Sequence, residues 1–354
     1  MNWRFSISFR RVRDSLWPIG QLAFGSALGY FIAKYGLGHP YPLLAVTVLI
    51  SSLGFQRATK PQTVLTTALA MVFGIVLSES VLLIYGSGTL QLFCVIAGSL
   101  LLARLISNNP AFALTVAIQA TLVQLLQAPS GGVFARAEDG IIGALVALAI
   151  TALVPRNPIK LARADSRVLF TVFKETLGII RQVLLSPDRA IADKALENIR
   201  RSQPLIDNWK LSLDSAESIA KISPFYRWAQ KEILQQKRLL EGMDFATRNL
   251  RVVTRRVDHM TKADKSHPQL AAIISKLVIA VDLLESSLDD FSMAAKSRKY
   301  IRKLAPNLAL DSFDPPLTTS ESAVLMQLRP LYVDLAMATG LSQDAAVELL
   351  PQVD

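Results

Sequence analysis

The arrangement of charged and apolar residues around residues 136–160 constrains the fold more than any other feature of the sequence. This stretch, RAEDGIIGALVALAITALVPRNPIK, opens with Arg136, Glu138 and Asp139 and then runs from Gly140 to Val154 without a charged side chain. Basic residues follow directly. A charged rim, an apolar middle and a basic exit are typical of a helix that crosses a membrane. We therefore expect the preceding residues to lie in a bilayer and the following ones in water.

The charges divide the chain at the same place. The chain has 38 Lys/Arg and 28 Asp/Glu, of which residues 1–154 hold only nine and four. Much of the positive excess flanks the apolar runs, so anionic lipid head groups explain the net charge of +10 better than nucleic acid does. We expect no nucleic-acid partner. The single Cys94 excludes an intrachain disulfide and a cysteine metal cluster.

Six membrane spans are predicted in the first half. With the N-terminus inside, most basic residues then fall on the cytoplasmic side, and both termini are cytoplasmic. Several runs are shorter than the roughly 20 residues that an untilted span needs, so four to seven spans remain open. The expected spans are Trp17–Leu37, Leu43–Phe55, Val64–Ile84, Leu90–Ile106, Ala111–Leu126 and Gly140–Val154.

The spans form a coarse internal repeat. Spans one to three and four to six each read as a hairpin plus a third helix, and a polar segment with an arginine precedes each third helix, QRATKPQ and FARAEDG. Because three is odd, the second triplet would lie inverted, which is a recurrent transporter plan.

Helical patterns continue to the C-terminus, without a strand pattern. Phe170, Phe173, Leu177, Ile180 and Leu184 follow the 3-4 spacing of a packed helical seam. The predicted fold is all-α: a six-helix transmembrane bundle of two three-helix repeats, followed by a cytoplasmic helical bundle. The expected segments are an amphipathic N-terminus at 1–16, the membrane domain at 17–154, the cytoplasmic domain at 155–304, a linker at 305–317 and C-terminal helices at 318–354.

Motifs of known enzymes are missing from the sequence. The three histidines, His39, His259 and His267, form no HExxH, and the sequence contains no P-loop and no GxSxG. We predict a protein that is not an enzyme and has no catalytic residues, no metal site and no cofactor.

Polar residues of the membrane half are the candidates for a substrate site. Cations at an inner mouth would attract an organic anion, although the positive-inside rule also explains them. Buried glutamines can bind substrate or join helices. The substrate candidates are Arg57, Lys60, Arg104, Asn108, Asn109, Gln119, Gln124 and Arg136. Glu79 and Asp139 are carboxylates able to couple transport to protons or to form a gate, Asp139 with Arg136.

These features resemble a known family. The chain resembles the fusaric acid resistance and aromatic acid exporter proteins in having two span triplets joined to a long helical domain. The third helix of each triplet also resembles theirs, with the residues Arg57…Thr66-Thr67-Ala68…Gly74 and Arg136-Ala137-Glu138-Asp139-Gly140…Gly143. More distantly, they resemble the plant aluminium-activated malate transporters. The resemblance implies export or conductance of organic anions by a homodimer.

The function expected from the sequence is export of small organic anions, aromatic ones included, across the plasma membrane, here the bacterial inner membrane. The expected partners are membrane lipid, the anion and a second copy of the chain. Two alternatives stay open: a membrane scaffold whose cytoplasmic domain binds a partner, and a passive anion channel.

The predicted topology can be tested by cysteine labelling in intact cells. A membrane-impermeant reagent should label a cysteine placed at Ser130 and should not label one placed at Ser186, because the two positions fall on opposite sides. Labelling of the Ser186 position would contradict the six-span count.

Overall fold

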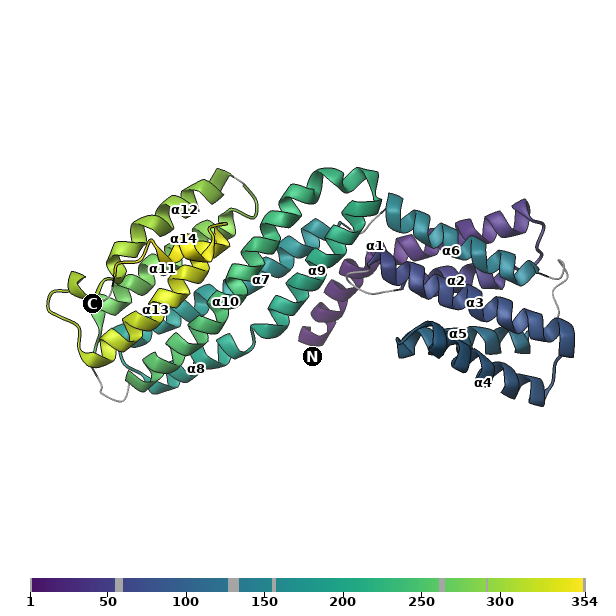
Figure 1. Ribbon diagram of the computed structural model, residues 1–354, viewed down its shortest axis with the longest axis horizontal. Coiled ribbons are helices and arrows are strands. Elements are labelled where there is room, and N and C mark those ends of the chain that lie inside the picture. The colour runs from purple at the N-terminus through teal and green to yellow at the C-terminus, as the bar shows by residue number, and fades with distance from the viewer. Residues whose placement is uncertain are drawn as a thin grey trace. The chain divides into compact units, whose positions relative to one another are not determined.

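The chain forms two compact units of helices. The computed structural model describes residues 2–54, 60–126, 134–154, 157–260, 265–290 and 292–352, in which every regular element is a helix (Figure 1). The first unit comprises Met1–Asn157 with Glu217–Arg227, and the second comprises Pro158–Ala216 with Trp228–Asp354. The all-helical prediction is therefore confirmed for the described residues.

The first unit contains six α-helices. Several begin or end at proline or glycine, as the turn residues of the sequence predict: α3 and α5 start on Pro61 and Pro110, and α2 and α3 stop at Gly54 and Gly86, both at positive φ. The helices are α1 (Asn2–Phe31), extended by a π-helical turn, η1 (Ile32–Gly36), α2 (Leu43–Leu53), α3 (Pro61–Tyr85), α4 (Thr89–Ile106), α5 (Pro110–Leu125) and α6 (Ala135–Leu153).

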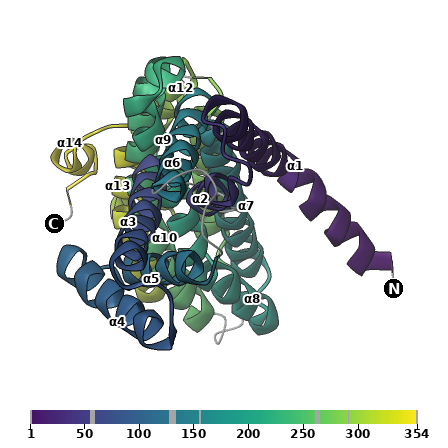
Figure 2. The same cartoon turned by 90° about the vertical axis from the view of Figure 1, so that its right-hand side faces the viewer.

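Helix α1 is longer than the first predicted span. It continues from Asn2 through Pro18 to Phe31 as one helix, so the N-terminal segment at 1–16 and the first span share one element (Figure 2). The composition changes from basic to apolar near Trp17, and Pro18, which could end a helix there, lies inside the helix instead.

Glycines let the helices of the first unit approach closely. Helix α3 packs against α5 and α6, α6 also packs against α2, and α4 packs against α5. A Cβ atom at Gly74 would lie 2.4 Å from the Val116 carbonyl oxygen, and one at Gly143 would lie 2.3 Å from that of Ala45. Small residues at such crossings allow the backbone contact that holds helices together in lipid.

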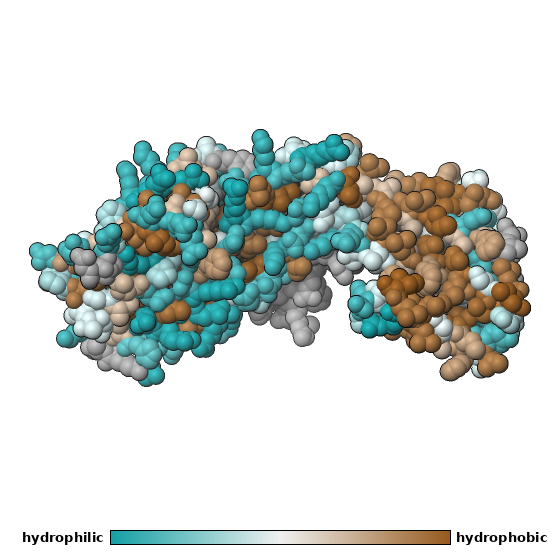
Figure 3. Space-filling view, viewed as in Figure 1, coloured by the Kyte–Doolittle hydropathy of each residue, from teal (hydrophilic) through white to brown (hydrophobic). Residues whose placement is uncertain are grey.

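The surface of the first unit is apolar. Figure 3 shows hydrophobic residues spread over this unit, whereas the surface of the second unit is mostly hydrophilic. Three helices, Ser15–Gly36, Pro61–Tyr85 and Thr89–Ile106, are long and apolar enough to cross a membrane, and α2 and α5 are shorter apolar helices. Large exposed apolar side chains such as Phe93 and Leu105 on α4 suit lipid as their solvent.

The second unit is built from long amphipathic helices and short connecting turns. Its helices are α7 (Pro158–Leu185), α8 (Arg189–Arg200), α9 (Gln203–Ile222, of which the last residues belong to the first unit), η2 (Pro224–Ala229), α10 (Gln230–Met260), α11 (Pro268–Ser286), α12 (Ser292–Leu304), η4 (Ala305–Leu308), η5 (Leu310–Ser312), α13 (Thr319–Ala338) and α14 (Gln343–Val347).

One hydrophobic core runs through the second unit. The predicted seam on α7 from Phe170 to Leu184 is buried in it, and Trp209 of α9 packs with its ring centroid 6.3 Å from that of Phe170. Helix α13 starts with a capping box, in which Thr318 and Glu321 bond to each other's backbone amides.

The segment expected as a linker is part of this core. Residues 305–317 form the turns η4 and η5, with Leu308 fully buried and Phe313 packed against the core. Helix α13 lies against α10, so the C-terminal helices share the core of the preceding ones. The prolines of this segment bend the chain without detaching it.

A buried carboxylate makes the second unit sensitive to pH. Asp334 on α13 is only 8% exposed and accepts a hydrogen bond of 2.6 Å from Asn249 Nδ2 on α10. Burial raises the pKa of Asp334 from 3.8 to about 6, against the opposing effect of the Asn249 hydrogen bond. Because the folded chain then binds this proton more tightly than the unfolded chain, protonation stabilises the fold. The contribution is complete below pH 3.8 and is lost as the pH rises through about 6.

We expect Asp334→Asn to remove this pH dependence. Between pH 7.5 and pH 5 the wild-type unit should gain about 1 kcal/mol from Asp334, or roughly 2–4 °C in unfolding temperature. The Asn variant should lack this gain and should unfold at a higher temperature than wild type at pH 7.5. Thermal unfolding of both proteins at the two pH values measures the difference. An identical pH dependence in both would contradict this role of Asp334.

Candidate functional site

The polar residues of the first unit gather at two opposite ends of its helices. Short turns join α3 to α4 and α4 to α5, so these three helices alternate in direction. The start of α3, the end of α4 and the start of α5 therefore lie at one end, which we call the Arg104 end. The end of α3, the end of α5 and the start of α6 lie at the other, which we call the Arg136 end.

The Arg104 end is exposed and held together by local hydrogen bonds. The Arg104 guanidinium donates to the Asn108 carbonyl oxygen at 2.7 Å, and Asn109 Oδ1 accepts from the Ala111 amide at 3.0 Å as the N-cap of α5. Lys60 is the half-buried N-cap residue of α3. Arg57 lies outside the described residues. The Asn109 side chain thus has a structural task, whereas Arg104 keeps an exposed charge.

At the Arg136 end, a buried arginine joins two helices. Arg136 is 6% exposed and donates to the carbonyl oxygens of Val123 at 3.2 Å and Leu126 at 3.0 Å. These carbonyls are at the end of α5, where helix geometry leaves them without an intrahelical partner. The guanidinium therefore supplies donors that the last turn of α5 requires, and it brings a positive charge to a negative helix terminus.

A buried carboxylate faces this arginine from α3. Glu79 is 3% exposed and interacts electrostatically with the Arg136 guanidinium and with the backbone amides of Arg136 and Ala137 in the first turn of α6. Neither amide reaches it with hydrogen-bond geometry, and both carboxylate oxygens are buried without a hydrogen-bond partner among the described residues. The positive helix terminus and the cation offset part of the cost of burying the charge.

A histidine outside the predicted set completes this end. His39, in the turn between η1 and α2, is 6% exposed, and its Nδ1 lies 2.7 Å from Asp139 Oδ1 on α6. Its Nε2 lies 3.4 Å from Glu138 Oε2, whose side chain is half exposed. Asp139 is itself 5% exposed. The imidazole thus connects a buried carboxylate to one that reaches the surface.

Two glutamines of α5 differ in their environment. Gln124 is buried, accepts from Ser78 Oγ on α3 at 3.4 Å and donates to the Gly86 carbonyl at 3.3 Å. Gln119 is 2% exposed, and its Nε2 has no hydrogen-bond partner among the described residues. Gln124 therefore acts as a link between α5 and the end of α3, whereas Gln119 retains a free donor inside the unit.

The structure thus brings together five groups that are far apart in the sequence. His39, Glu79, Gln124, Arg136 and Asp139 lie at one end of the unit, and Lys60, Arg104, Asn108 and Asn109 lie at the other. No cluster of three potential metal ligands occurs within the described ranges. Carboxylates beside an imidazole and a guanidinium can bind and pass protons, and they can open or close a pathway by exchanging partners.

His39 was not predicted as a site residue, because its partners lie 100 residues away along the chain. Its sequence environment, Gly-His-Pro, indicates a turn, and a turn residue is expected at the surface. The sequence did offer one signal for His39, which is its position in a short turn between two apolar helices. A polar residue in such a turn lies at one end of the membrane helices, where it can contact other polar residues.

The coupling between Glu79 and Arg136 can be measured with a double-mutant cycle. Arg136→Gln should lower the unfolding temperature of the protein in nanodiscs strongly, because it leaves Glu79 without its cation. In a Glu79→Gln background the same change should cost less, with a coupling of about 1 kcal/mol or more. The hydrogen bonds to Val123 and Leu126 are lost in both backgrounds and cancel. Equal costs would show that Glu79 is independent of Arg136.

Comparison with known proteins agrees with this division of the chain. The family model described as fusaric acid resistance protein-like matches residues 12–150. An uncharacterized protein of Corynebacterium glutamicum is 26% identical over 348 residues, which cover 96% of this chain and 89% of that protein. A Mycobacterium tuberculosis protein named "Putative arylamide transporter" is 26% identical over 196 residues, or 52% of each chain, and the Mycobacterium bovis protein of the same name matches equally.

These relatives and the apolar helices of the first unit identify a membrane protein of transporter type. The names point to transport rather than to catalysis. The predicted resemblance to the fusaric acid resistance proteins is thereby confirmed over residues 12–150, the part of the chain that carries the apolar helices.

Proposed function

We propose that this protein exports small organic anions, including aromatic ones, across the bacterial inner membrane. The observation that carries the proposal is the buried polar group at the Arg136 end: ionisable side chains are costly inside an apolar helical unit, and they mark substrate or proton pathways when they occur there. The names of the matching family and of the mycobacterial relatives support an organic, aromatic substrate.

In this proposal the two ends have different tasks. The charges of Lys60 and Arg104 attract the anion from the cytoplasm, together with Asn108 and Asn109 at the same end. Arg57, which lies outside the described residues, is proposed to add a further charge. Gln119 and Gln124 offer hydrogen bonds along α5. The Arg136 end forms the outer gate, where Glu79 and Asp139 bind protons and Arg136 exchanges its partners. His39 adds a proton-carrying group to this gate.

The proposed membrane domain consists of six spans in two inverted triplets, with both termini in the cytoplasm. Two observations support the repeat. Residues 42–48, PLLAVTV, and 110–116, PAFALTV, are identical at four of seven positions, and they start the second helix of each triplet. In addition, the third helix of each triplet packs with a glycine, Gly74 or Gly143, against the second helix of the other.

We assign the short helices α2 and α5 and the charged helix α6 to the membrane as well. They pack directly against the longer apolar helices, and the charges of α6 are confined to its first turns. The family resemblance further suggests a homodimer, with the second unit in the cytoplasm.

Transport by purified protein in proteoliposomes tests the proposal. The wild type should transport radiolabelled benzoate faster than the neutral analogue benzamide. Arg104→Gln should raise the KM for benzoate about three- to tenfold, because it removes electrostatic attraction at the entrance, and should leave benzamide unaffected. The difference in KM between the wild type and Arg104→Gln should become smaller at high salt, because salt screens the charge.

Lys34→Gln is the matched control, because it removes a cation from the opposite end of the same unit, where Lys34 donates to the Tyr30 hydroxyl. It should leave the KM for export unchanged. Equal losses for benzoate and benzamide would remove Arg104 from the site. A wild type that transports neither compound would contradict the proposal and favour a scaffold, and transport that no proton gradient drives would favour a channel.

A further inference from the structure

The second unit contains a cavity of about 280 Å³ whose lining differs from that of the other hollows in the unit. Helices α10, α11, α12 and α13 contribute its wall. Three cations, Lys231, Arg238 and Arg298, stand at it, and its lining contains no Asp or Glu. The rest of the lining combines apolar side chains, among them Leu234, Leu239 and Leu284, with the polar side chains of Gln235, Ser287, Ser297 and Thr339.

The cations of this cavity are not neutralised by carboxylates. Lys231 and Arg238 are exposed residues on one face of α10, two turns apart, and neither forms an ion pair within the part of the chain that is described. Arg298 of α12 donates to the Thr339 carbonyl oxygen at 2.6 Å, which fixes its guanidinium at the end of α13. Three positive charges around an apolar wall favour a ligand with a negative charge and an apolar body.

A buried hydroxyl also lies in the wall without a partner. Ser297 is completely buried, and its Oγ makes no hydrogen bond to a described residue. Serine in a helix ordinarily bonds to a carbonyl one turn earlier, as Ser275 and Ser286 of α11 do. A buried hydroxyl without a partner lowers stability, so its presence beside the cations indicates a ligand that accepts its hydrogen bond.

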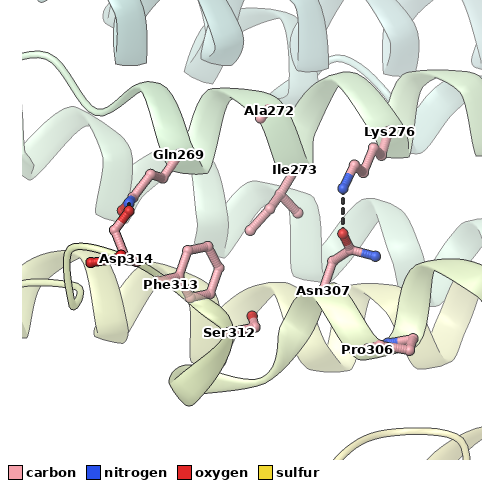
Figure 4. A pocket seen from close by; sticks show the side chains of 9 residues that line it. All are labelled: Gln269, Ala272, Ile273, Lys276, Pro306, Asn307, Ser312, Phe313 and Asp314. Atoms are coloured by element: carbon pink, nitrogen blue, oxygen red, sulfur yellow. Dashed lines mark hydrogen bonds between the residues drawn. The ribbon is translucent and has the colours of Figure 1, made fainter.

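Two neighbouring hollows lack this combination. The cleft in Figure 4 is larger, at about 460 Å³, but Lys276 there is hydrogen-bonded to Asn307, Gln269 donates to the Asp314 carbonyl at 3.0 Å, and Asp314 contributes a negative charge. The hollow beside Lys299 and Lys303 on α12 is cationic, but Ala295 is its single apolar lining residue. Only the 280 Å³ cavity, of these three, joins cations, an apolar wall and an unpartnered buried hydroxyl.

We propose that this cavity binds a small organic monoanion of the size of a single-ring aromatic carboxylate. The volume of about 280 Å³ lies just below the usual range of ligand pockets, so it suits a single ring better than a nucleotide or a peptide. The ring packs against the exposed Leu234, the carboxylate accepts a hydrogen bond from Ser297, and Lys231, Arg238 and Arg298 neutralise its charge. The proposal follows from the chemistry of the cavity and does not depend on transport by the first unit.

Photoaffinity labelling of the full-length protein in nanodiscs tests the site. The probe is 4-azidobenzoate, and the labelled peptides are mapped by mass spectrometry. We expect labels on peptides from α10, α12 or α13, competition by benzoate, and little labelling by neutral 4-azidobenzamide. Labels within residues 12–153 report separately on the membrane unit, so failure of one proposal does not depend on the other.

Two variants distinguish the cavity from a general basic surface. Ser297→Ala should weaken the benzoate competition about tenfold, as expected for the loss of a hydrogen bond to a charged group. It should leave the unfolding temperature without ligand unchanged or higher, because it removes an unsatisfied hydroxyl. Lys231→Gln with Arg238→Gln should weaken the competition at least about threefold.

The matched control is Lys299→Gln with Lys303→Gln, which removes the same charge from the neighbouring hollow. It should leave labelling unchanged. Equal losses in the control and in the Lys231/Arg238 variant would overturn the proposal, as would undiminished labelling in Ser297→Ala. Full competition by inorganic phosphate would overturn the requirement for an apolar body.

Discussion

The burial of Arg136 is the interaction on which the Arg136 end of the first unit depends. A guanidinium cannot leave water without acceptors, and here it finds them at the last turn of α5, on Val123 and Leu126. The same residue sits in the first turn of α6 and interacts with Glu79 of α3. Helices α3, α5 and α6 are thus connected by one side chain at this end.

Glycines determine how closely these helices approach elsewhere. At Gly74 and Gly143 the space for a Cβ atom is already occupied by a carbonyl oxygen of the neighbouring helix. The helices therefore meet backbone to backbone, and polar side chains such as Gln124 and Ser78 reach across α3 and α5. The helices thus cross tightly at their glycines and are held by ionic contacts at the Arg136 end. Most polar side chains in the interior of the unit therefore contact a neighbouring helix.

Much of the fold was predictable because its signals are local. The 3-4 spacing from Phe170 to Leu184, the capping box at Thr318 and the prolines that start α3 and α5 each act within a few residues, and each has the expected structural effect. Helix α1 runs unbroken through Trp17 and Pro18, so the change in composition predicted there separates two parts of one helix and does not end it.

The site was predictable only in part, because its contacts connect distant residues. Polar residues inside apolar runs identified Glu79, Gln119, Gln124, Arg136 and Asp139, all of which are buried. Their partners did not follow from the sequence: Arg136 was expected beside Asp139, but Asp139 pairs with His39 and Arg136 with the end of α5. The cap that Asn109 Oδ1 forms on α5 was likewise not expected, because only a substrate contact was predicted for this residue.

The unsatisfied polar atoms of the first unit bear on how a transporter of this kind would work. Both oxygens of Glu79 and the Nε2 atom of Gln119 are buried without hydrogen-bond partners among the described residues, and each such group costs about 1–3 kcal/mol. A carrier needs two conformations of similar free energy, so that binding of a substrate or proton can shift the balance. In the proposed transporter, a proton on Glu79 would remove its buried charge, and a substrate beside Gln119 would accept a hydrogen bond from its Nε2 atom. A rearrangement of α6 would change the contacts of Arg136 with Glu79. The buried polar groups thus limit the stability of the present conformation, and in the proposed transporter that limit would allow a ligand with only a few contacts to change it.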